Sequence, residues 1–258
     1  MSARDTIGLF GIAIDNVTMA QALEQLRLVL MDERGHDYVV TPNVHHIVRL
    51  QRDALFRQAY AGASLVLADG MPLVWASRSL GRPLKMRVTG ADLLPCVCQM
   101  AASLDKSVFL LGAGDGVAAR AAQKLRHAYP GLRIAGTYSP PMGFERDPAE
   151  ERRVVERVNG AKADVLAIGL GAPKQELWIA AHRDQLHFRV ALCIGAAIDY
   201  VAETLKRAPH WMQRNGLEWL WRLAQEPRRL WRRYLVEDLE FASLLVEEWW
   251  RKKRTGAS

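Results

Sequence analysis

The chain has 258 residues, half of them hydrophobic and 24% charged, with three cysteines and a formal net charge of +7. This length accommodates one large α/β domain or two small ones, and the composition excludes fibrous, disulfide-scaffold and fully disordered proteins. No apolar run approaches the roughly 20 residues that span a bilayer. The short apolar stretch near the N-terminus lacks a basic region and a cleavage site, so we expect a mature cytoplasmic chain.

Seven apolar runs are predicted as strands. In chain order they are Ile7–Ile14, Tyr38–Thr41, Leu65–Ala68, Val108–Leu111, Arg133–Ala135, Val165–Ile168 and Val190–Ile194. Several are nearly continuous in Val, Leu and Ile, which is typical of strands covered on both faces. Helix starts are predicted at Thr18 (a capping box with Gln21, for a helix to about Glu33), at Pro72, at Pro173 and at Asp147.

This alternation predicts an α/β fold for residues 1–202, namely a Rossmann-like, doubly wound, mainly parallel sheet. After Ala202 the pattern changes to helices alone, so residues 203–258 are expected to form a C-terminal helical appendage. The three cysteines do not supply the two cysteine pairs of a zinc site. We expect them to be buried, reduced thiols.

The net charge and the tryptophans are concentrated in this last segment. Residues 206–258 hold twelve Lys/Arg and seven Asp/Glu, a net charge of +5, which leaves +2 for residues 1–205. Six of the eight tryptophans lie in the same segment: Trp211, Trp219, Trp221, Trp231, Trp249 and Trp250. Arginine suits phosphate and tryptophan suits the interfacial zone of a membrane, so this pattern favours a surface contact over tryptophans buried in a core.

Polar residues follow two of the predicted strands, where ligands of open parallel sheets bind. Thr41 and Asn43 lie at the end of the second predicted strand and just beyond it. They could hold sugar hydroxyls, although Asn43 could equally cap the next helix. Asp69 ends the third strand and could serve as a general base or as a helix cap.

Two later strand ends carry weaker signals. The glycine-rich loop that starts at Gly112 could approach a phosphate or form a plain tight turn, but its spacing is not that of a dinucleotide site. The segment Gly171–Glu176 places an amide and two opposite charges at a helix start. Glu176 is explained there by the helix dipole alone, whereas Gln175 is less easily dismissed.

Taken together, these motifs resemble the WecG/TagA/CpsF glycosyltransferases (glycosyltransferase family 26). The likeness covers nearly the whole chain and includes Thr41–Asn43, Ala68–Gly70, Arg87–Asp92, Gly171–Glu176, Gly195–Asp199, Arg207–Pro209, Glu218–Leu223 and Glu226–Arg229. No single motif decides it, but their order and number are specific. Glu203 departs from the pattern, because glycine is expected at that position.

The resemblance implies transfer of N-acetylmannosamine, its uronic acid or glucose from a UDP-sugar to a polyprenyl-diphosphate-linked saccharide. It implies an inverting reaction without a metal or cofactor, at the inner face of the cell membrane, and it leaves self-association open. Asp69 matches the family's proposed catalytic base. The other matched residues are Thr41, Asn43, Arg87 and Gln175 in the sugar pocket, Asp199 at the uridine, and the appendage arginines Arg222, Arg229 and Arg232 over the diphosphate.

Two other classes of function compete with this interpretation. The basic, tryptophan-rich segment could bind RNA through phosphates and stacked bases, but no recognition motif accompanies it, so we expect no nucleic-acid partner. A nucleotide-dependent oxidoreductase is weakened by the wrong glycine spacing after residue 111.

Overall fold

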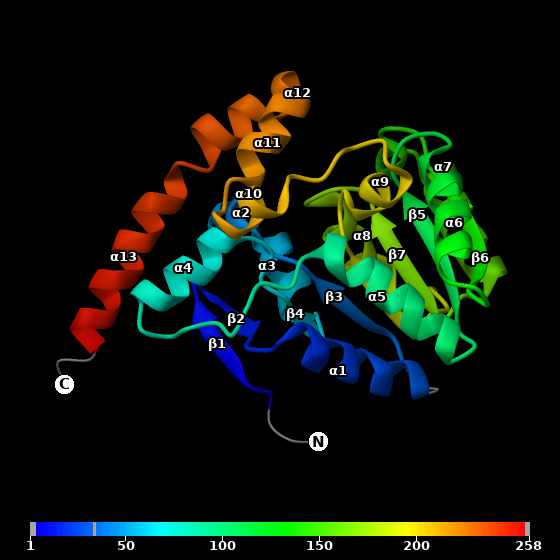
Figure 1. Cartoon of the computed structure of the whole chain (residues 1–258), viewed down its shortest axis with the longest axis horizontal. Coiled ribbons are helices and arrows are strands. Elements are labelled where there is room, and N and C mark those ends of the chain that lie inside the picture. Colours follow the sequence, from blue (N-terminus) through cyan, green and yellow to red (C-terminus); the bar gives the residue numbers. More distant parts are fainter. Residues whose placement is uncertain (1–3, 33–34, 256–258) are drawn as a thin grey trace.

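A six-stranded parallel sheet lies at the centre of the computed structural model, which describes residues 4–32 and 35–255 (Figure 1). The strand order is β4-β3-β8-β7-β5-β6, and every neighbouring pair is parallel. The bounds are β3 Asp37–Val40, β4 Leu65–Val66, β5 Ser107–Gly112, β6 Arg133–Tyr138, β7 Val165–Gly169 and β8 Val190–Cys193. The predicted α/β fold with a parallel sheet is confirmed.

Helices cover both faces of this sheet, which explains the nearly continuous apolar strands. Val39 belongs to the core on one face, while its neighbours Tyr38 and Val40 belong to the core on the other. The first face carries α1 (Met19–Met31), α5 (Gly90–Ser103), α6 (Val117–Ala128) and α9 (Ala197–Ala202). The second carries α2 (Val44–Arg52), α3 (Ala54–Ala61), α7 (Pro148–Ala161) and α8 (Lys174–His182).

The prediction of one strand over Ile7–Ile14 is wrong. The segment is an antiparallel hairpin of β1 (Thr6–Leu9) and β2 (Ile12–Asp15), separate from the main sheet. Phe10 and Gly11 form its turn with φ values of 53° and 82°, the left-handed pair that two-residue hairpins require. The Asp15 carboxylate joins the hairpin to the sheet by accepting the backbone N–H of Val66 at 2.7 Å.

Three of the predicted helix starts are confirmed. The Thr18 hydroxyl accepts the Gln21 N–H at 3.3 Å and the Gln21 side chain accepts the Thr18 N–H at 2.9 Å, which completes the capping box of α1. The predicted end of this helix at Glu33 lies outside the described residues. The helix α4 (Met71–Ser79) begins with Pro72 in its first turn, and α7 begins after Asp147. Pro173 is the N-cap of α8 instead of a first-turn residue.

From Ala202 onwards the described chain forms helices alone. They are α10 (His210–Arg214), α11 (Glu218–Gln225), α12 (Pro227–Arg232), the π-helical turn η3 (Arg233–Glu237) and α13 (Glu240–Thr255). Glu203 caps α9 with φ 57°, the left-handed conformation for which glycine is best suited. The glycine expected at this position would adopt the same backbone conformation without strain.

The long helix α13 returns along the body and passes α4 (Figure 1). Phe241, Leu244 and Leu245 pack against the core on its inner face, and the Phe241 ring lies 5.1 Å from that of Phe10. Five of the six C-terminal tryptophans are exposed: Trp211, Trp219, Trp231, Trp249 and Trp250. Within residues 4–32 and 35–255, we find no helix that is both long and apolar enough to cross a membrane.

Candidate active site

A cavity of about 500 Å³ opens at the carboxyl ends of four adjacent strands, β4, β3, β8 and β7. The segments that follow these strands supply one wall, and α11, α12, η3 and the start of α13 supply the other. Seven of the residues predicted for the site line it: Thr41, Asn43, Asp69, Arg87, Gln175, Arg222 and Arg229. The structure therefore brings together residues that are separated by up to 188 positions in the chain.

Asp69 lies at the end of the β4 segment and is partly buried. Its backbone N–H donates to Pro42 O at 2.8 Å, and its carboxylate accepts the Gly90 N–H at 3.4 Å. Burial and the nearby carboxylate of Glu218 raise the pKa of Asp69 to about 7, while the positive charge of Arg87 opposes this rise. A carboxyl group with such a pKa can accept a proton from a substrate hydroxyl near neutral pH.

Thr41 and Asn43 are held by bonds that also explain the local fold. The Thr41 hydroxyl donates to Cys193 O at 2.9 Å, which ties β3 to β8. The Asn43 side chain caps α2 by accepting the His46 N–H at 3.3 Å, and it also accepts from Arg233 of the appendage at 3.2 Å. Asn43 is thus both a helix cap and a cavity residue, and its contact with a sugar stays a prediction.

Gln175 is almost fully buried at the start of α8, with both ends of its amide engaged. Its Nε2 donates to the Glu176 carboxylate at 2.7 Å and its Oε1 accepts the Gly195 N–H at 3.1 Å. Glu176 is completely buried, and this burial raises its pKa to about 7. The helix dipole alone therefore does not account for Glu176, which sequence reasoning had left without a role.

Ion pairs attach the appendage to the body beside the cavity. The Arg87 guanidinium pairs with Glu218 of α11 at 3.0 Å and also donates to the Gln213 side chain at 3.0 Å. Arg207 pairs with Asp92 at the start of α5, with one N–H to carboxylate distance of 2.9 Å. Arg87 is the predicted sugar-pocket residue, and its contact with Glu218 was not foreseen.

The arginines of the appendage divide into two groups. Arg222, Arg229 and Arg233 line the cavity, and the Nε atoms of Arg222 and Arg233 are buried without a hydrogen-bond partner among the described residues. Arg232 lies outside the lining, with 74% of its side chain exposed and its Nε 3.7 Å from Glu237. The resemblance assigns Arg232 to the diphosphate, and that assignment stays a prediction.

Gly112 and Asp199 also lie outside the cavity lining. Gly112 ends β5, one strand beyond β7, and a Cβ atom there would come within 2.6 Å of the Gly169 backbone. The close approach of β5 to β7 therefore explains why residue 112 is a glycine. Asp199 lies in the first turn of α9, and burial raises its pKa. Their proposed contacts with the donor remain predictions.

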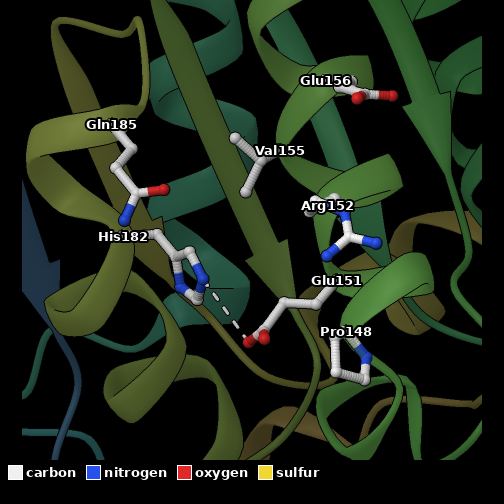
Figure 2. Close-up of a pocket in the computed structure, with 7 residues that line it drawn as sticks. All are labelled: Pro148, Glu151, Arg152, Val155, Glu156, His182 and Gln185. Atoms are coloured by element: carbon white, nitrogen blue, oxygen red, sulfur yellow. Dashed lines mark ion pairs between the residues drawn. The ribbon is translucent and has the colours of Figure 1, made fainter.

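A second, open hollow lies between α7 and α8 on the surface (Figure 2). Figure 2 shows His182 pointing toward Glu151, and their ring nitrogen and carboxylate oxygen are 3.4 Å apart. None of the predicted site residues lies in this hollow. Over the described ranges of the chain, no group of three or more His, Cys, Asp or Glu side chains is arranged to hold a metal ion.

Comparison with known sequences identifies the family of the chain. The sequence model of the Glycosyl transferase WecG/TagA/CpsF family matches residues 7–255. The chain belongs to this family. The match over residues 7–255 includes the residues of both walls of the cavity.

Two relatives within the family are named for a specific reaction. An N-acetylglucosaminyldiphosphoundecaprenol N-acetyl-beta-D-mannosaminyltransferase of Bacillus spizizenii is 30% identical over 226 residues, which cover 88% of this chain and 85% of that protein. A protein of the same name from Staphylococcus aureus (strain MRSA252) is 29% identical over 227 residues, covering 88% and 87% respectively. The chain is therefore a WecG/TagA/CpsF glycosyltransferase that is similar to these enzymes over most of its length.

Proposed function

We propose that the chain transfers a sugar from a UDP-sugar to a polyprenyl-diphosphate-linked saccharide, with inversion at the anomeric carbon. The names of the two relatives favour N-acetylmannosamine as the sugar and N-acetylglucosamine-diphosphoundecaprenol as the acceptor. The observation that carries the proposal is the single cavity that Asp69 shares with the appendage arginines Arg222 and Arg229. A proton acceptor and a set of cations in one cavity are what a displacement with a diphosphate leaving group needs.

In this reaction the Asp69 carboxylate takes the proton from an acceptor hydroxyl. The freed oxygen bonds to the anomeric carbon, the bond from that carbon to the β-phosphate oxygen breaks, and UDP departs with the electron pair. Arg222 and Arg229 would neutralise the charge that develops on the diphosphate, so no metal is required for this purpose. Arg232 would join them only if the appendage closes further over the bound donor.

The appendage would also bring the enzyme to its acceptor. Its exposed tryptophans and the basic residues 251–254 at its end suit the anionic inner face of the cell membrane. Residues 1–202 would then act as the catalytic body and residues 203–258 as the membrane-associating part. Liposome flotation compared with an RNA mobility-shift assay tests this point, because retention by RNA alone would contradict it.

Transfer itself is tested by UDP release from a panel of UDP-sugars with a short-chain polyprenyl-diphosphate acceptor. We expect release with UDP-N-acetylmannosamine, dependent on the acceptor, and a loss of about 10²–10⁴-fold in the Asp69→Asn variant. Asparagine keeps an oxygen that can accept the Gly90 N–H but cannot take up the proton. Near-normal turnover of this variant would exclude Asp69 as the base, and NADH binding without UDP binding would favour an oxidoreductase.

A further inference from the structure

The inference concerns Glu176, a buried carboxylate that the proposed reaction does not use. Glu176 has no exposed surface and does not line the cavity, but it lies directly behind two residues that do. Its Oε1 accepts from Gln175 Nε2 at 2.7 Å and lies 4.0 Å from His46 Nδ1. Its second oxygen, Oε2, is buried without a partner among the described residues. A carboxylate in this position is costly to bury, so a purely structural side chain would be expected to be apolar.

The bonds around Gln175 show what this carboxylate does. The amide nitrogen donates to Glu176 and the amide oxygen accepts the Gly195 N–H at 3.1 Å. Rotation of the amide by 180° would place its oxygen against the carboxylate and its NH₂ group against the Gly195 N–H, so both contacts would become repulsive. Glu176 and the Gly195 N–H therefore select the same one of the two amide orientations, Glu176 by holding the nitrogen end.

In this orientation each end of the Gln175 amide keeps one unused hydrogen-bonding position, and Gln175 is among the residues that line the cavity. The amide nitrogen has a second N–H and the amide oxygen a second lone pair. A donor and an acceptor side by side match the hydroxyl and acetamido groups of a hexosamine. His46, the second polar neighbour, is neutral near pH 7, because burial and the charge of Arg233 lower its pKa well below the usual range. The Tyr60 hydroxyl lies 2.6 Å from His46 Nδ1 and holds its ring in place.

We propose that Glu176 is a positioning residue that fixes the Gln175 amide so that its free N–H and oxygen lone pair bind the donor's sugar. The inference rests on the proposed transfer of a sugar from a UDP-sugar. It assigns Glu176 no contact with substrate, and all of its effect passes through Gln175.

The test is a double-mutant cycle on the full chain, read by steady-state kinetics with UDP-N-acetylmannosamine and by inhibition with UDP. Glu176→Met removes the acceptor while keeping the size of the side chain, and we expect the donor KM to rise about five- to tenfold, the worth of one hydrogen bond. The inhibition constant of UDP, which lacks the transferred hexosamine, stays unchanged. Glu176→Gln keeps a carbonyl oxygen for Gln175 and keeps the donor KM within about threefold.

The decisive measurement is Glu176→Met in a Gln175→Ala background. If Glu176 acts through Gln175, the second substitution leaves the donor KM where Gln175→Ala had placed it, whereas independent effects would multiply. Glu176→Leu replaces Glu176→Met if circular dichroism shows that the Met variant does not fold. Multiplying effects, or a Glu176→Met donor KM equal to the wild-type value, refute the positioning role while leaving the transfer reaction intact. If the wild-type chain transfers no sugar from any UDP-sugar, the proposed function fails and this inference fails with it.

Discussion

The raised pKa of Asp69 predicts that this proposed catalytic base destabilises the folded protein at neutral and alkaline pH. The pKa rises from the usual 3.8 to about 7 on folding, a difference of about 3 units. Below pH 3.8 the carboxyl is protonated in both states and contributes nothing. As the pH rises from 3.8 to 7, the unfolded chain gives up its proton before the folded protein does, so stability falls, and above pH 7 the whole penalty is present.

Asp69→Asn removes this penalty, because asparagine is neutral at every pH and still offers an oxygen to the Gly90 N–H. At 1.36 kcal/mol per unit the full shift corresponds to about 4 kcal/mol, and partial exposure of the side chain to solvent reduces this to about 2–4 kcal/mol. We therefore expect the variant to be more stable than the wild type by this amount at pH 8 and equal to it at pH 3.5. The same variant is the one expected to lose transfer.

Urea unfolding of both proteins, followed by tryptophan fluorescence and circular dichroism at several pH values, measures the difference. Glu176 has a similarly raised pKa, but it is present in both proteins, so its contribution cancels. A free energy difference that does not change between pH 3.5 and 8, or a variant that is less stable at pH 8, would refute the reasoning about Asp69.

Two further predictions use matched pairs of variants. Gly90→Ala should destabilise the protein by about 1–3 kcal/mol in urea unfolding, because a Cβ atom there would lie 2.9–3.1 Å from Ile194 atoms. The control is Gly160→Ala in α7, where a Cβ atom meets nothing within 4 Å and the substitution should be neutral or stabilising. Equal effects of the two substitutions would contradict the close approach at residue 90. Arg233→Ala should lower sugar transfer from the UDP-sugar about 10–100-fold, and Arg232→Ala should lower it less than about threefold, because only Arg233 lines the cavity. The reverse order of the two effects in the UDP-release assay would assign the diphosphate to Arg232.

Much of the site was predictable because parallel strands end at the same edge of a sheet. Thr41, Asn43, Asp69 and Gln175 each follow a strand, so that alternation of strands and helices was enough to place them together. Gly112 follows a strand by the same logic but lies outside the cavity, since β7 separates β5 from β8. Strand order arises from long-range packing, which a local pattern does not encode.

The remaining differences come from local geometry that apolar spacing does not show. The turn at Phe10-Gly11 carries none of the Asn-Gly or Asp-Gly pairs that usually mark a hairpin. The apolar segment Ile7–Ile14 around it is therefore predicted as a single strand. Whether Arg232 or the adjacent Arg233 lines the cavity depends on where the helix after Pro227 changes its winding. Nothing in a run of apolar and basic residues fixes that point.

Because η3 is π-helical, the number of residues in this stretch affects the orientation of the helix that follows it. A π-helical turn holds one residue more than an α-helical turn, and each residue of an α-helix advances the side chains by about 100° around the axis. Deletion of one residue within 233–237 would therefore rotate the chain that leaves η3 by about 100°. Because only Asp238 and Leu239 separate η3 from α13, it would disturb the contacts of Phe241 with Phe10 and of Glu240 with Arg52. The length of this short stretch therefore affects how the following helix packs, so the fold should tolerate a substitution here, Arg233→Ala included, far better than an insertion or deletion.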